Sequence, residues 1–150
     1  MGSESLLHRE TALSHEGACK EVVSALIVRD NKVLLMRRAA HEPFAGCYEL
    51  PGGTVEGSET HQDALMREVV EETGLAIRAI GELLGVSEFS TTPDVCALNF
   101  VYHLELEEGV VTLSIEHDDY CFIDVDEAKD LPLTDNARRA LAMLQKPATA

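Results

Sequence analysis

Residues 53–75 read GTVEGSETHQDALMREVVEETGL, and local signals within this stretch predict a helix from Thr60 to Thr73. Thr60 is a suitable N-cap, Asp63 places an acidic side chain in the first turn, and Gly74 ends the helix. The side chains of this stretch therefore share one rigid element, and their spacing determines which of them face the same way.

A helical wheel at about 100° per residue separates these side chains into two groups. The acidic group places Glu68, Glu71 and Glu72 within one turn of each other. It has two open interpretations: a solvated helix face, or a site for a hard cation such as Mg²⁺ or Mn²⁺, which prefers carboxylate oxygens. The other group is an apolar stripe that we expect to contact the core, formed by Leu65, Met66, Val69 and Val70.

The frame around the glutamates favours the cation site. From Gly53 to Leu75 the stretch meets every position of the pattern G-x5-E-x7-R-E-U-x-E-E-x-G-U, in which U is aliphatic. This pattern is the Nudix box, and its seven fixed letters would match by chance in about one chain in 10⁷ at ordinary amino-acid usage. The chain therefore resembles the Nudix hydrolase family, and the segments on both sides of the box resemble MutT-type members.

The resemblance implies a role for each charged residue of the box. Glu59 and Arg67 would orient the loop and a metal-binding glutamate during catalysis. The metal, Mg²⁺ or Mn²⁺, would be held by side chains of the box helix and by a backbone carbonyl of the preceding turn. These expected metal-site residues are Glu68, Glu71, Glu72, Gly52 and Gly53.

The family reaction is hydrolysis of a pyrophosphate bond, in which a carboxylate accepts the proton of the attacking water. Two candidates for this base stay open, Glu68 in the box and Glu116 between two expected strands, where several relatives carry a metal-binding or basic glutamate. Glu116 is alternatively an ordinary turn residue. Asp118 and Asp119 are weaker substitutes.

Two further segments are similar to MutT-type enzymes in regions that bind the nucleotide. Arg38, with Arg37 as the second choice, is the arginine expected to hold the nucleotide, and the alternative is a solvated strand end. Asp135 or Asn136 is expected to form a hydrogen bond with a purine, and the alternative is helix capping.

The resemblance leaves the substrate class and the assembly open. A (d)NTP, oxidised forms included, is favoured, and ADP-ribose or another NDP-sugar is the alternative. A nucleotide-sensing module without turnover is less favoured, because such domains usually lose box glutamates. A prenyl diphosphate isomerase is disfavoured, because its cysteine motif is not recognisable near Cys47 or Cys96. A homodimer is compatible with the family.

Composition limits the other partners. The 150 residues include 12 Lys and Arg against 27 Asp and Glu, a net charge of −15, which repels the phosphate backbone of duplex nucleic acid. No apolar run is long enough to cross a membrane. The four cysteines lack metal-site spacing and are expected to be buried free thiols, which favours a reducing, cytoplasmic location.

The remaining pattern predicts an α+β domain. Its mixed, mostly antiparallel sheet would lie between the box helix and a C-terminal helix in an α/β/α sandwich, and the resemblance implies the Nudix fold. We expect residues 1–20 to be a polar lead-in that need not be ordered, and residues 21–147 to form the Nudix hydrolase domain. Strands are expected over 22–28, 32–37, 47–50, 76–86, 95–106, 110–115 and 119–125, a helical turn over 126–131, and a last helix over 134–146.

Overall fold

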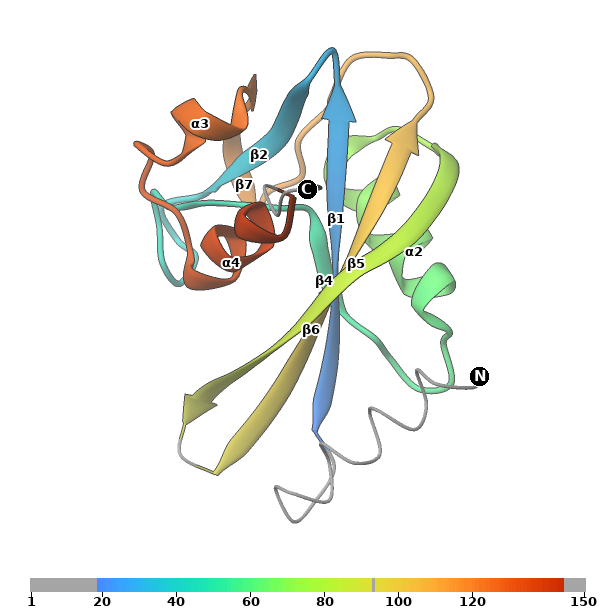
Figure 1. Ribbon diagram of the computed structural model, residues 1–150, viewed down its shortest axis with the longest axis vertical. Coiled ribbons are helices and arrows are strands. Elements are labelled where there is room, and N and C mark those ends of the chain that lie inside the picture. The colour runs from blue at the N-terminus through green and yellow to red at the C-terminus, as the bar shows by residue number, and fades with distance from the viewer. Residues whose placement is uncertain (1–18, 93, 145–150) are drawn as a thin grey trace, which may run out of the picture.

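The computed structural model describes residues 19–92 and 94–144, which form a mixed sheet with helices on both faces (Figure 1). The helices are α2 (His61–Thr73), α3 (Val125–Ala128) and α4 (Asp135–Leu144). The strands are β1 (Lys20–Arg29), β2 (Lys32–Arg38), β3 (Tyr48–Glu49), β4 (Gly52–Thr54), β5 (Ile77–Thr92), β6 (Val95–Leu106) and β7 (His117–Ile123).

Strand β1 is the centre of the sheet, whose order is β3-β2-β1-β6-β5 with β4 on β1 and β7 on β2. Only the β1–β6 pair is parallel among the named strands, so the predicted mixed, mostly antiparallel sheet is confirmed. Strand β1 pairs with β4 along residues 22–24 and with β2 only at residues 28 and 29. The two halves of the sheet therefore diverge from β1, which leaves space between β4 and β2.

Alternating side chains of β1 and β2 supply two apolar cores, one under each helical layer. The predicted α/β/α layering is therefore confirmed. The first core joins Val23, Ala25, Ile27, Leu34 and Met36 to Leu65 and Val69 of α2. The second core joins Leu26, Val33 and Leu35 to Ala137, Ala140 and Leu141 of α4.

The box helix begins and ends where its sequence predicts. Thr60 and Asp63 form a reciprocal capping box, and Gly74 ends the helix in the left-handed conformation at φ 74°. The predicted apolar stripe is wrong in part, because Met66 and Val70 are 53% and 47% exposed. Helix α2 is rotated so that Glu72 lies on the buried face instead.

Two segments between the expected elements differ from the prediction. Residues 110–115 form no strand: the amide of Thr112 donates to the carbonyl of Thr73, which ties this segment to the end of α2. Residues 52–54, where no strand is expected, form β4 against β1. Gly52 is required there, since a Cβ would lie 2.1 Å from the carbonyl oxygen of Val23.

The cysteine prediction is wrong for two of the four residues. Cys19 and Cys96 form a disulfide across 77 positions of sequence, whereas Cys47 and Cys121 are free thiols that are only partly buried. The parallel register of β1 and β6 pairs Lys20 with Ala97. Cys19 and Cys96, which directly precede these two residues, therefore lie side by side. The cysteines therefore no longer favour a reducing compartment.

The expected lead-in lies largely outside the described residues, as does the end of the expected last helix, which is described to Leu144. Lys20, assigned to the lead-in, is the first residue of β1. No helix in the described part of the chain is long and apolar enough to span a membrane.

Candidate functional site

A cavity of about 610 Å³ opens where the two halves of the sheet diverge. Side chains from both layers line it, so residues distant in sequence meet there. The charged and polar lining residues are Lys20, Ser24, Arg38, Glu42, Glu49, Thr54, Glu68, Glu72, Glu116, Thr134 and Asn136, beside Gly52 and Gly53. Phe44 and Phe89 are the aromatic residues of the lining.

Glu72 is the buried carboxylate of this cavity, with 4% of its surface exposed. The buried neighbours Leu65 and Val69 fix the rotation of α2 that turns it inward. The Gly52 amide donates to Glu72 Oε1 at 3.0 Å. Burial raises the pKa of Glu72 to about 9, with smaller contributions from nearby carboxylates, although the Gly52 hydrogen bond opposes the shift. The site therefore favours a positive charge beside this group.

Glu68 lies one turn earlier on α2 and lines the same cavity. Arg67 Nη1 donates to Glu68 Oε2 at 2.8 Å, and burial still raises the pKa of Glu68. A Cβ on Gly53 would lie 2.4 Å from Glu68 Cδ. A side chain at position 53 would therefore displace the Glu68 carboxylate from its present position.

Arg67 connects the helix to the loop that precedes it. Its guanidinium donates to both carboxylate oxygens of Glu59 at 2.7 and 2.8 Å, and to the carbonyl of Thr54 at 3.1 Å. The two hydrogen bonds from Arg67 lower the pKa of Glu59 to about 2, and a hydrogen bond from the Glu56 amide acts in the same direction. Glu59 and Arg67 thus hold the loop in one position relative to Glu68.

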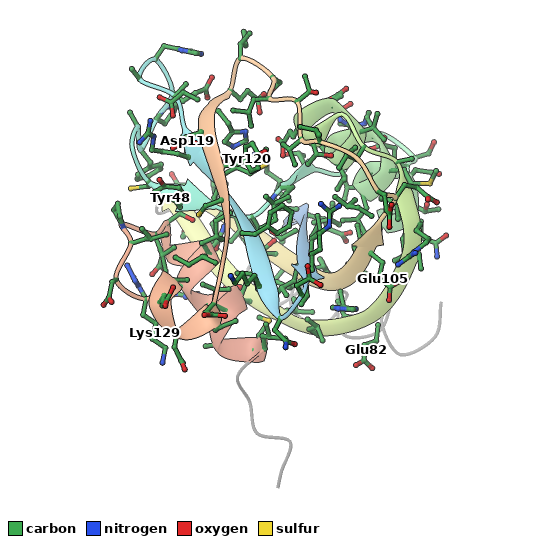
Figure 2. The ribbon with its side chains drawn as sticks, turned by 90° about the horizontal axis from the view of Figure 1, so that it is seen from above. Tyr48, Glu82, Glu105, Asp119, Tyr120 and Lys129 are labelled. Carbon is green, nitrogen blue, oxygen red and sulfur yellow. A yellow bond between two sulfur atoms is a disulfide. The ribbon has the colours of Figure 1, made fainter. Side chains whose placement is uncertain are left out.

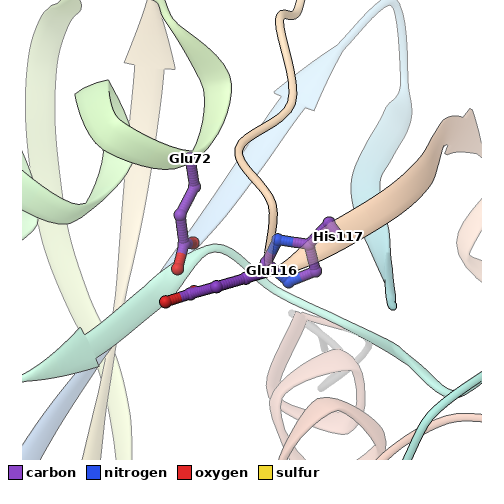
Figure 3. Close-up of side chains that lie close together, drawn as sticks. All are labelled: Glu72, Glu116 and His117. Atoms are coloured by element: carbon purple, nitrogen blue, oxygen red, sulfur yellow. The ribbon is translucent and has the colours of Figure 1, made fainter. Parts of the chain in front are cut away.

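Glu116 reaches the cavity from the opposite side, immediately before β7. Its backbone carbonyl accepts from the Ala39 amide at 2.9 Å, which ties it to the end of β2. One ligand atom each from Glu72, Glu116 and His117 lie within 4.8 Å of one another (Figure 3). The predicted convergence of Glu116 with the box is therefore present in space.

Two residues of this site were missed by sequence reasoning. His117 Nε2 lies 2.8 Å from Glu49 Oε2, and the same oxygen accepts from Arg38 Nη1 at 2.8 Å. Because His117 directly follows the candidate Glu116 in the sequence, that position is a signal that could have identified His117 as a residue of the site. For Glu49, two residues before Pro51, we find no local signal.

The two candidate arginines separate. Arg38 lines the cavity and is held by Glu49, Glu42 and the carbonyl of Pro43. Arg37 lies outside the cavity lining and pairs with Asp118 at 2.8 Å. They are neighbours in β2, where successive side chains point to opposite faces of the sheet.

The C-terminal candidates separate as well. Asp135 is exposed and pairs with Arg139 at 3.3 Å, whereas Asn136 lines the cavity with a buried Oδ1 that has no partner among the described residues. Thr134, and not Asp135, caps α4 by accepting from the Ala137 amide at 3.2 Å. Helix capping is therefore the role of Thr134, and the side-chain amide of Asn136 stays available to another partner.

Glu71 is the one predicted metal-site residue that the structure does not bring to the cavity. It is exposed, whereas Glu68 and Glu72 on either side of it line the cavity. The three carboxylates Glu68, Glu72 and Glu116 suit a divalent cation, because hard oxygens in a partly buried site need a positive charge. Such an ion would in turn bind an anionic phosphate.

Comparison with known proteins gives a consistent result. The NUDIX domain family matches residues 20–144. An ADP-ribose pyrophosphatase of Methanocaldococcus jannaschii is 37% identical over 110 residues, which cover 73% of this chain and 64% of that protein. A CTP pyrophosphohydrolase of Escherichia coli is 34% identical over 113 residues, 75% of this chain and 82% of that protein. The solution structure of the Escherichia coli ORF135 protein has a TM-score of 0.76 at 29% identity, covering 87% of this chain and 95% of that one.

Proposed function

Since the chain belongs to the NUDIX family, we propose that it uses Mg²⁺ or Mn²⁺ to hydrolyse a pyrophosphate bond in a small nucleotide, a (d)NTP or modified (d)NTP. One observation carries the proposal: Glu68, Glu72 and Glu116 line a single cavity beside Gly52 and Gly53 of β4. NUDIX hydrolases use divalent metal ions, which neutralise phosphate oxygens and lower the pKa of a bound water.

The residues of the chain fit that ion. Glu72 is buried with a pKa of about 9, so its carboxylate form needs a cation. Glu68 and Glu116 add oxygens, and the backbone at Gly52 or Gly53 would complete the set. Glu71, which is exposed and outside the cavity lining, belongs to the proposal only by resemblance.

We assign the base to Glu116 rather than Glu68. Glu68 accepts a hydrogen bond from Arg67 at 2.8 Å, so one of its two oxygens is already occupied. Glu116 is exposed at the cavity, and among the described residues its carboxylate accepts no hydrogen bond. Geometry therefore favours Glu116 as the group that takes the proton of the attacking water.

The nucleotide would lie between Arg38 and Asn136. Arg38 offers a held guanidinium for a phosphate, and Asn136 offers an unpaired amide oxygen for a base N–H. Phe44 lines the same cavity, is 74% exposed and has φ 58°, a conformation that costs a bulky residue about 1–3 kcal/mol. We propose that this aromatic side chain stacks on the base.

ADP-ribose is the second candidate substrate, because the 37% identical archaeal relative is named an ADP-ribose pyrophosphatase. A panel of (d)NTPs, oxidised (d)NTPs and NDP-sugars with Mg²⁺ or Mn²⁺, followed by product analysis, separates the two. Pyrophosphate release from a triphosphate supports the first, and AMP release from ADP-ribose supports the second. If the protein hydrolyses substrates of neither class, the proposal is contradicted.

Binding can be tested apart from turnover. The chain has no tryptophan, so Phe44→Trp places a single tryptophan, which can be excited selectively, at the cavity. Nucleotide should quench it if the base stacks there. Unchanged emission at saturating nucleotide, with binding shown by calorimetry, would remove the stacking assignment.

Three points of context also belong to the proposal. Residues 21–147 would form the catalytic domain, the protein would be cytoplasmic, and a homodimer remains a prediction. Limited proteolysis, cell fractionation and analytical ultracentrifugation test these points in turn.

A further inference from the structure

His117 is a buried histidine that the proposed chemistry leaves without a role. It begins β7, opposite Arg38 of β2, and its side chain is 1% exposed. Because β7 is paired with β2 and the ring is buried, the ring cannot easily turn away. The ring is therefore held close to Glu49, which Nε2 contacts at 2.8 Å, and close to Glu72 and Glu116 (Figure 3).

The hydrogen bond to Glu49 fixes which nitrogen carries the proton. Glu49 Oε2 also accepts from Arg38, so it acts as a carboxylate acceptor and His117 Nε2 donates to it. In the neutral ring, Nδ1 then presents a lone pair. His117 Nδ1 is buried and has no hydrogen-bond partner in the described structure.

A neutral imidazole oriented in this way by a carboxylate is the usual arrangement of a metal-bound histidine. Metal-binding histidines donate their second ring N–H to a carboxylate or carbonyl, which fixes the tautomer and strengthens the ligand. An octahedral ion with bonds of about 2.1 Å places its ligand atoms about 3.0 to 4.2 Å apart. The ligand atoms of Glu72, Glu116 and His117 lie within 4.8 Å of one another, so small side-chain movements close the set around an ion.

We propose that His117 Nδ1 is a nitrogen ligand of the divalent cation that Glu72 and Glu116 hold. This inference rests on the proposed function, because it concerns the same ion. It changes the expected chemistry of the site: an imidazole favours Mn²⁺ and other first-row transition metals over Mg²⁺, which prefers oxygen ligands. Glu49 is a positioning residue in this arrangement, since it acts through the imidazole ring.

The test is pulsed electron paramagnetic resonance of the full-length protein loaded with Mn²⁺. We expect ¹⁴N modulation from a directly bound imidazole, converted to the ¹⁵N pattern when the protein carries [¹⁵N]histidine. His117→Gln should remove the modulation and lower the preference for Mn²⁺ over Mg²⁺ by about tenfold or more. His41→Gln is the matched control, because His41 is exposed beside the cavity residue Glu42, and it should retain the signal.

The outcomes separate the two hypotheses. Bound Mn²⁺ without histidine nitrogen coupling, or coupling that survives in a folded His117→Gln, would overturn the assignment of His117 and leave the carboxylate site intact. Failure of Mn²⁺ to bind at all would overturn the proposed function as well. If His117→Gln does not fold, a Zn²⁺ titration of the unaltered protein decides, because the ¹⁵N resonance of His117 Nδ1 must shift as the ion binds.

Discussion

The Gly52 amide nitrogen lies 3.0 Å from Oε1 of Glu72, twenty positions later in the sequence. This hydrogen bond joins the turn before the box helix to the last turn of the helix, at the most buried carboxylate of the cavity. It stabilises the charged form of Glu72, yet burial dominates and keeps its pKa at about 9. The protein therefore folds around a carboxyl group that, without a cation, retains its proton.

The first prediction concerns stability against pH without divalent ions. Unfolding lowers the pKa of Glu72 from about 9 to its ordinary value near 4.5. At pH values between these two, the folded protein therefore holds one more proton than the unfolded protein. Stability should then fall as pH rises from 5 to 9, by up to about 1.4 kcal/mol per pH unit from this group. Chemical denaturation in EDTA checks this, and Glu72→Gln should flatten the slope. Equal slopes in both proteins would contradict the pKa assignment.

The second prediction concerns the base. Glu116→Gln should lower kcat by about tenfold or more with little change in KM, because the amide cannot accept the proton of the attacking water. Glu108→Gln is the matched control, since Glu108 is an exposed glutamate outside the cavity lining. A kcat in Glu116→Gln equal to that of the control would return the role to Glu68.

The third prediction compares the paired arginines. Arg38→Ala should raise KM more than it lowers kcat, because Arg38 lines the cavity and positions the nucleotide. Arg37→Ala should leave both constants nearly unchanged, since Arg37 pairs with Asp118 outside the cavity lining. Steady-state kinetics of the two variants distinguish the residues, and a larger KM effect for Arg37 would reverse the assignment.

The fourth prediction concerns the disulfide. Thiol titration of the denatured, unreduced protein should find two reactive cysteines, Cys47 and Cys121, and four after reduction. Joining Cys19 to Cys96 closes a long loop of the unfolded chain, which is worth about 4 kcal/mol, so reduction should lower the free energy of unfolding by that order. Four reactive thiols before reduction would contradict the bond.

The local part of the site could be predicted from the sequence. The limits of α2 follow from Thr60 and Gly74, and the spacing of the box places Glu68 and Glu72 on one helix. The rotation of the helix about its axis could not be predicted, because the helical wheel places Met66 and Val70 on the face expected to contact the core. The Gly52 amide, which lies outside the helix, donates a hydrogen bond to Glu72 and so lowers the free-energy cost of burying this carboxyl group.

The non-local part of the site depends on strand pairing. His117, Glu49 and Arg38 lie on three different strands, and their shared hydrogen bonds arise only when β7 and β3 pair with β2. The labelled acidic residues Glu82, Glu105 and Asp119 likewise come from three different strands (Figure 2). No pattern within one segment contains this information.

Calorimetric titration of Mn²⁺ and Mg²⁺ into the protein and into Glu72→Gln tests the central claim most directly. Glu82→Gln is the control, because Glu82 is an exposed glutamate outside the cavity lining. We predict saturable binding to the unaltered protein and to the control, and an affinity lower by about tenfold or more in Glu72→Gln. An unaltered protein that binds neither ion, or a Glu72→Gln protein that binds as tightly as the control, would contradict the account.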